Sequence, residues 1–117
     1  MHEVSVLNNI LEIVENSIKD KKVVNVDKIY LSVGILSGVS KLALIHAFSL
    51  IEKTDVFSNT QLEIHDCPLV VWCQDCQLAT TLHEDISLLC SNCKKPLSTI
   101  ISGKELNIDK LEVIYET

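Results

Sequence analysis

The stretch CQDC at residues 73–76 and the stretch CSNC at 90–93 decide how this chain is organised. Each stretch holds two thiols separated by two residues, and residues 77–89 stand between the two pairs. Two such pairs are typical of a structural zinc site, in which four thiolates surround one tetrahedral Zn²⁺ ion. The sequence therefore predicts a module held together by metal. Its expected ligands are Cys73, Cys76, Cys90 and Cys93.

Two other interpretations of these cysteines stay open, namely structural disulfides and a redox-active dithiol. A thioredoxin-like protein carries a single Cys-x-x-Cys pair where a strand meets a helix, and neither pair is expected at such a junction. Zinc is therefore the favoured interpretation. The fifth thiol, Cys67, lies outside the pattern and is interpreted as a buried or idle cysteine.

Length and composition favour a small folded protein. The 117 residues are enough for one domain with a small metal module, and the hydrophobic content of 47% supports a core. The net charge of −6 has the wrong sign for a nucleic-acid binder, which neutralises phosphates with basic residues. We expect neither a membrane-spanning segment nor a secretory signal, and therefore a cytoplasmic protein with reduced thiols.

Outside the cysteine pairs, the hydrophobic pattern predicts helices and strands. The second expected helix is apolar around much of its circumference, so we expect it to be heavily buried, with His46 as a core or edge residue. Alternation breaks between Ile108 and Leu111, which predicts a bulge or a turn near Asn107–Lys110. The expected elements are a helix at 4–20, a strand at 23–33, a helix at 40–53 capped by Ser40, and strands at 62–66 and 106–115.

These elements predict an α+β fold in which two helices pack on a mixed sheet of about three strands. Two strands joined through a helix imply a parallel, right-handed crossover. The main domain comprises residues 1–70 and 97–117, and the cysteine module, residues 71–96, is inserted between two of its strands. Because the module is too short to bury a core alone, we expect it to fold on its metal.

The N-terminal sequence Met1-His2-Glu3 offers a second metal site. The α-amine, the His2 amide nitrogen and the His2 imidazole can chelate one ion through a five-membered and a six-membered ring. Nitrogen donors in a tetragonal plane select Ni²⁺ or Cu²⁺ over Zn²⁺. Met1 is expected to persist before His2, and Glu3 can add a carboxylate or a backbone nitrogen. A lone surface histidine is usually only solvated, so the position of His2 carries this prediction.

The remaining sequence carries weaker signals. His65 is a candidate outer-sphere group on a strand near the module, and His83 is expected on a loop between the cysteine pairs. The sequence contains no paired-carboxylate signature of acid/base chemistry and no glycine-rich phosphate loop, so we do not expect it to bind nucleotide by itself.

The Met1-His2-Glu3 start, the two-helix α+β layout and the inserted cysteine pairs together resemble the HypA family, the nickel-incorporation factors of [NiFe]-hydrogenase maturation. The resemblance covers essentially the whole chain and includes LSVG at 31–34 and LEV at 111–113. It implies a non-enzymatic metallochaperone. Its transported Ni(II) would lie on His2 and Glu3 with adjacent backbone nitrogens, and its structural Zn(II) on the four cysteines.

The resemblance also implies partners. These are a HypB-type GTPase, the hydrogenase large-subunit precursor and, in some bacteria, urease maturation proteins, with a homodimer left open and no nucleic acid or membrane expected. Two positions depart from the family pattern. Ser40 stands where many members carry an acidic residue, and Gln77 and Lys94 stand where some members have histidines. We therefore expect no further nickel ligand at either place.

Two rival functions remain at this point. A zinc-ribbon adaptor for protein or nucleic acid would leave His2 without a role, and its nucleic-acid form is opposed by the acidic charge and by the few aromatic residues. A thiol redox protein would need its cysteine pairs free of metal. Only the chaperone interpretation requires nickel binding at the N-terminus, so this property distinguishes it from the two rival functions.

Overall fold

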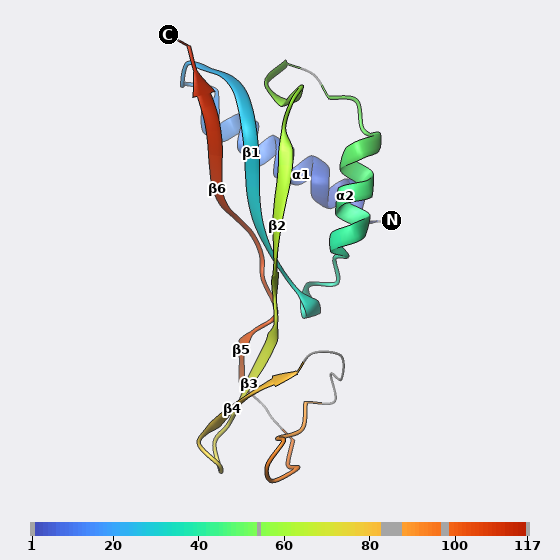
Figure 1. Ribbon diagram of the computed structural model, residues 1–117, viewed down its shortest axis with the longest axis vertical. Helices are drawn as coiled ribbons and strands as arrows, with labels where there is room; N and C mark the ends of the chain where they lie inside the picture. The colour runs from blue at the N-terminus through green and yellow to red at the C-terminus, as the bar shows by residue number, and fades with distance from the viewer. Residues whose placement is uncertain (1, 54, 83–87, 97–98, 117) are drawn as a thin grey trace.

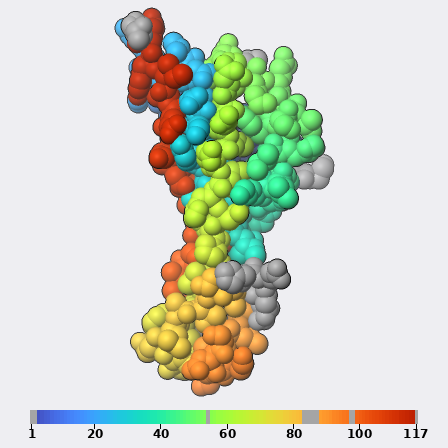
Figure 2. All heavy atoms as spheres, in the orientation of Figure 1, coloured from blue at the N-terminus to red at the C-terminus, as the bar shows by residue number. Residues whose placement is uncertain are grey.

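The computed structural model describes residues 2–53, 55–82, 88–96 and 99–116. These residues form two modules arranged along one axis, with overall extents of 58 × 28 × 16 Å (Figure 1). The larger module holds both helices and a three-stranded sheet, and the smaller holds the cysteine pairs and a second three-stranded sheet. The space-filling view shows the molecule narrowing where the two modules meet (Figure 2).

β1 (Val23–Gly34) is the central strand of the larger sheet, whose order is β2-β1-β6. It pairs in parallel with β2 (Gln61–Cys67) and antiparallel with β6 (Leu106–Tyr115). The predicted mixed sheet and parallel crossover are thus confirmed. The predicted bulge is confirmed as well, because Tyr30 pairs with Lys110 and Leu31 with Ile108, which leaves Asp109 as the extra residue.

The helices α1 (His2–Ile18) and α2 (Lys41–Leu50) pack against this sheet and bury a common core. The buried residues of α1 recur every three or four positions, as on one face of a helix, and those of β1 mostly alternate. Each fully buried aliphatic side chain stabilises the fold by about 1.5–3 kcal/mol. The most buried of these residues are Leu7, Val14, Val26, Ile29, Leu31 and Leu44.

The helices differ from their predicted bounds, and α2 differs also in burial. α1 begins and ends two residues earlier than expected, and α2 is shorter, covering residues 41–50 instead of 40–53. The prediction that α2 is heavily buried is wrong, because Leu42 and Leu50 are 77% and 71% exposed. His46 is likewise an exposed residue. Among the described residues, the buried positions of α2 are 44, 47 and 48, which lie on one side of the helix. An apolar side chain is often exposed, so an apolar helix is not necessarily a buried one.

The smaller sheet has the order β4-β3-β5, with both pairs antiparallel. Its strands are β3 (Leu69–Cys73), β4 (Leu78–Leu82) and β5 (Thr99–Ser102). The sequence pattern did not predict this sheet, since strands of four or five residues give little periodicity. The sheet includes residues on both sides of the expected module, 71–96. Leu69 and Val71 form its buried centre together with Cys73 and Cys90.

The two modules join at a narrow segment that we call the waist, made of residues 34–36, 67–69 and 103–105. Pro68 separates β2 from β3, and its missing N–H suits a break in strand pairing there. The Gly34 N–H donates to the Glu105 carbonyl and the Leu36 N–H donates to the Gly103 carbonyl, each at 2.7 Å. The Leu36 side chain packs against the core of the smaller module. Backbone pairing therefore sets how the modules are joined.

Replacing Gly34 with alanine is expected to disrupt the waist. A Cβ at Gly34 would overlap the Gly103 carbonyl and lie 2.7 Å from Glu105 Oε1. The φ of Gly34 is −92°, which alanine adopts without strain, so the effect is steric. We expect the free energy of unfolding, measured by urea titration, to fall by about 1–3 kcal/mol, as overpacking does.

Lys104→Ala is the control for this substitution, because Lys104 is an exposed residue of the same segment. It should change the free energy of unfolding by no more than about 0.5 kcal/mol. If Gly34→Ala proved as stable as Lys104→Ala, the close approach of Gly34 and Gly103 would be contradicted.

Candidate functional site

Four sulfur atoms come together in the smaller module, as the spacing of the cysteines predicted. The Sγ atoms of the four paired cysteines all lie within 4.8 Å of one another. Cys73 Sγ is 3.7 Å from Cys93 Sγ, and Cys90 Sγ is 3.9 Å from Cys76 Sγ. A tetrahedral ion with metal–sulfur bonds of about 2.3 Å requires sulfur–sulfur separations of about 3.8 Å. The two shortest distances match this geometry, and the cluster as a whole is compact enough to surround one metal ion.

Each cysteine pair folds so that its backbone points hydrogen-bond donors at a sulfur. The Cys76 N–H donates to Cys73 Sγ and the Cys93 N–H donates to Cys90 Sγ, both at 3.5 Å. The Asn92 N–H also donates to Cys90 Sγ, at 3.4 Å. Such bonds favour the charged thiolate, which is the form that binds metal.

The residue after each pair turns the chain away from the cluster. Gln77 and Lys94 have φ of 54° and 63°, the left-handed conformation that non-glycine residues adopt uncommonly. At the second pair, the Lys94 N–H donates to the Cys90 carbonyl at 3.0 Å and the Cys90 N–H donates to the Lys95 carbonyl at 2.9 Å. Gln77 and Lys94, which depart from the family pattern, therefore have a backbone role as the last residues of the two turns.

Hydrogen bonds and burial shift the pKa values of Cys90 and Cys73 in opposite directions. The backbone N–H groups of Cys93 and Asn92 lower the pKa of Cys90 to about 6. The Cys76 N–H also acts to lower the pKa of Cys73, but burial and the neighbouring thiols outweigh it, so this pKa is raised. Four thiolates within 4.8 Å of one another repel strongly unless a cation lies between them. The arrangement is therefore suited to a bound cation.

Asn92 was not singled out by its sequence context, yet it connects the two pairs. Its side-chain Nδ2 donates to Cys76 Sγ at 3.3 Å, while its backbone N–H donates to Cys90. An asparagine between two cysteines carries no spacing signal, so sequence reasoning alone does not find it. The exposed ion pair between Lys95 and Asp75, at 3.1 Å, also spans the two pairs but adds little stability because both side chains are solvated.

The second candidate metal site lies where α1 begins. Met1 and the side chain of His2 lie outside what the structure describes, so their predicted roles remain predictions. α1 starts at His2, and the first N–H groups of a helix have no carbonyl partner within it. The Glu3 carboxylate accepts a long hydrogen bond from the Ser40 N–H, at 3.4 Å. This contact brings the start of α1 to the start of α2.

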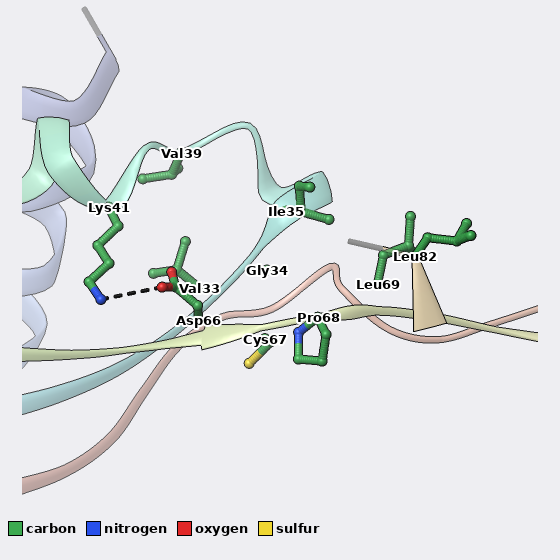
Figure 3. A pocket seen from close by; sticks show the side chains of 10 residues that line it. All are labelled: Val33, Gly34, Ile35, Val39, Lys41, Asp66, Cys67, Pro68, Leu69 and Leu82. Carbon is green, nitrogen blue, oxygen red and sulfur yellow. Dashed lines mark hydrogen bonds and ion pairs between the residues drawn. The ribbon is translucent and has the colours of Figure 1, made fainter. Parts of the chain in front are cut away.

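Ser40 is the N-cap of α2, as predicted. Its hydroxyl oxygen accepts a hydrogen bond from the Ala43 N–H at 3.2 Å. A serine here therefore performs a structural task, and its N–H is the group that contacts Glu3. Beside it, a pocket of about 590 Å³ extends toward the waist, with the ion pair of Lys41 and Asp66 at 3.3 Å on its wall (Figure 3).

The other residues considered from sequence lie apart from the sulfur cluster. His65 is exposed on β2, and His83 lies outside the described residues. Cys67 ends β2 as a half-buried free thiol, one residue before Pro68.

Comparison with known proteins places these features in a family. Residues 1–113 match the family model described as hydrogenase/urease nickel incorporation, metallochaperone, HypA. The chain is 31% identical over 112 residues to the hydrogenase maturation factor HypA of Chloroflexus aurantiacus, covering 96% of this chain and 98% of that protein. It is 29% identical over 113 residues to the HypA of Aquifex aeolicus, covering 97% of each.

A solved structure supports the fold independently. The solution structure of the Ni metallochaperone HypA from Helicobacter pylori matches with a TM-score of 0.65 and 24% sequence identity, over 99% of this chain and all of that one. Another solution structure of a HypA protein matches with a TM-score of 0.68. From the family match over nearly its whole length, we conclude that this chain belongs to the HypA family of nickel metallochaperones for hydrogenase maturation.

Proposed function

We propose that this chain binds Ni(II) at its N-terminus and delivers it during maturation of [NiFe]-hydrogenase, while Zn(II) on the four cysteines fixes the smaller module. The observation that carries the proposal is the start of α1 at His2. Because the first amides of a helix make no intrahelical hydrogen bond, the His2 nitrogen can lose its proton to nickel without breaking the helix. The α-amine and the imidazole complete the nitrogen set.

Glu3 and Ser40 support an exposed, exchangeable nickel site. The hydrogen bond from the Ser40 N–H holds the Glu3 carboxylate at the start of α2, and Ser40 contributes no carboxylate of its own. The nickel set is then mainly nitrogen from the first residues, with Glu3 as the nearest carboxylate. Such a site lies at the end of the chain and suits a cargo that has to be released. Acidification should weaken it, since amide coordination requires proton loss.

The sulfur cluster suits zinc and a structural role. Its donor set is four cysteines, of which Cys73 and Cys90 are buried and Cys76 and Cys93 are half-buried, and a four-thiolate set is typical of a structural zinc site. When bound, the ion links the two cysteine turns and stabilises a sheet of short strands. The four sulfurs leave no open position for a cargo metal. The two metals therefore have separate tasks, one transported and one resident.

The partners we propose are proteins. A HypB-type GTPase would supply the nucleotide chemistry, for which this sequence has no phosphate loop, and the hydrogenase large-subunit precursor would receive nickel. Urease maturation proteins and a second copy of the chain are further candidates. The exposed Leu42 and Leu50 of α2 are apolar side chains that a protein partner can cover. Among the described residues, no helix is long and apolar enough to cross a membrane. We propose a cytoplasmic location, where the thiols stay reduced.

Replacing His2 should remove the high-affinity nickel site. His2→Ala deletes the imidazole and should weaken nickel binding by about a hundredfold or more, as for loss of a primary ligand. The measurement is a calorimetric nickel titration of the zinc-loaded protein. His46→Ala is the matched control, since His46 is an exposed histidine elsewhere on the molecule, and its affinity should be unchanged. Equal affinities for the two variants would contradict the proposal and favour the adaptor interpretation.

Removing the metal should unfold the smaller module and spare the larger one. The single tryptophan, Trp72, lies on β3, so its fluorescence reports on the smaller module. Both described helices lie in the larger module, so their circular dichroism reports on it. A chelator should shift the Trp72 emission to the red and leave the helical signal, because the two modules have separate cores.

Cys67→Ser is the control for this experiment, because Cys67 stands outside the four-sulfur group. It should retain zinc and respond to the chelator as the native protein does, whereas Cys76→Ser should lose zinc. Loss of the helical signal together with the Trp72 shift would show that the metal holds the whole chain, contrary to the proposal.

A further inference from the structure

The face of the larger sheet opposite the helices is open and carries ligating side chains that neither proposed metal site uses. On β2, the alternating residues Glu63, His65 and Cys67 share one face of the strand. Figure 3 shows the Cys67 thiol on the opposite side of β2 from Asp66 and its partner Lys41. We call the side carrying Cys67 the open face.

Strand pairing brings a carboxylate to the same place. His65 pairs with Ser32 of β1, and Ser32 pairs with Asn107 of β6. The bulge beside this position frees Asp109 from the strand pairing, and the Ser32 hydroxyl donates to Asp109 Oδ2 at 2.5 Å. Burial raises the pKa of the Cys67 thiol, and the Ser32 hydroxyl acts in the opposite direction and lowers it. Ser32 thus contacts a carboxylate on one side and pairs on the other with β2, the strand that carries the thiol.

A shallow hollow joins His65 to Asp109, and Cys67 lies two residues further along β2. The hollow has a volume of about 280 Å³ and is lined by Tyr30, Glu63, His65 and Asp109 among others. His65 and Cys67 are separated by two residue steps of a strand, about 6.6 Å. Their side chains can therefore reach one ion that lies on the open face, over the backbone of the residue between them. The carboxylates of Glu105, Asp109 and Asp66 all act electrostatically on the Cys67 thiol, and this negative charge favours a cation.

We propose that His65, Cys67 and Asp109 form an additional, exchangeable site for a divalent metal ion. An imidazole nitrogen, a thiolate sulfur and a carboxylate oxygen make a mixed donor set that suits borderline ions such as Ni²⁺ or Zn²⁺. The hard ions Mg²⁺ and Ca²⁺ are excluded by the thiolate. The site does not depend on the proposed role of the N-terminus, because it shares no residue with it.

The geometry makes this a weak site. Among the described residues, the ligating groups whose donor atoms already lie within 4.8 Å of one another are the four paired cysteines. At the open face, side chains must rotate, and Asp109 must give up its bond to Ser32. Desolvation raises the pKa of the Cys67 thiol, so an incoming ion also has to displace its proton. All three costs favour rapid release over storage.

Nickel absorption spectroscopy tests the site directly. Ni²⁺ is added to the zinc-loaded full chain carrying His2→Ala, which removes the N-terminal imidazole. We expect the near-ultraviolet band of a thiolate–nickel bond to appear on titration. Adding Cys67→Ser should abolish the band, and adding His65→Ala should weaken binding by about tenfold or more. Adding His46→Ala, the control for an exposed histidine, should change nothing.

Three results would overturn the site. The first is the absence of the band in the His2→Ala protein, and the second is a band that survives Cys67→Ser, which would place nickel on the zinc cysteines. Zinc released during titration is measured to identify that case. The third is a His65→Ala titration identical to that of His46→Ala. Circular dichroism and zinc content verify that each variant is folded. The Cys67→Ala variant repeats the test with a substitution that, unlike serine, introduces no hydroxyl group.

Discussion

Backbone hydrogen bonding across the waist is the constraint on which the two-module arrangement depends. The N–H groups of Gly34 and Leu36 donate to carbonyls of Glu105 and Gly103, so the end of β1 is fixed against the segment that leads into β6. Gly34 has to be glycine because a Cβ would overlap the Gly103 backbone. The two buried cores lie on either side of this contact, and Leu36 of the waist packs against the core of the smaller module.

The two modules are stabilised in different ways. The larger module buries about a dozen apolar residues between two helices and a sheet, which suffices for a small core. The smaller module buries two aliphatic residues and two cysteines, which is too little to offset the entropy lost on ordering its chain. Its four sulfur atoms lie within 4.8 Å of one another, and two of their separations, 3.7 and 3.9 Å, are those of a tetrahedral metal site. We therefore propose that a bound metal ion takes the place of hydrophobic burial in the smaller module.

Much of this structure could be predicted from sequence because its signals are periodic. The apolar spacing in α1, the alternation in β1 and the break at Asp109 each reflect a single local geometry. The cysteine spacing is equally direct, because two-residue gaps place both thiols of a pair on one turn.

Other features could not be predicted because they depend on contacts between distant segments. The smaller sheet joins Leu69–Cys73 to Thr99–Ser102, and four-residue strands have no readable period. The exposure of Leu42 depends on what covers α2, and the position of His65 beside Ser32 depends on strand register. The nickel site at Met1 and His2 rests on the chemistry of their nitrogens and on the start of α1 at His2, since Met1 and the His2 side chain lie outside the described residues.

The most direct test of the central claim is a nickel titration of two forms of the zinc-loaded protein. One form has its native N-terminus, and the other is extended by one residue before Met1, which keeps every side chain but moves the α-amine away from His2. The account predicts tight binding to the native form and loss of most of that affinity in the extended form. Equal binding by both forms would contradict it, because nickel would then not need the amine at Met1.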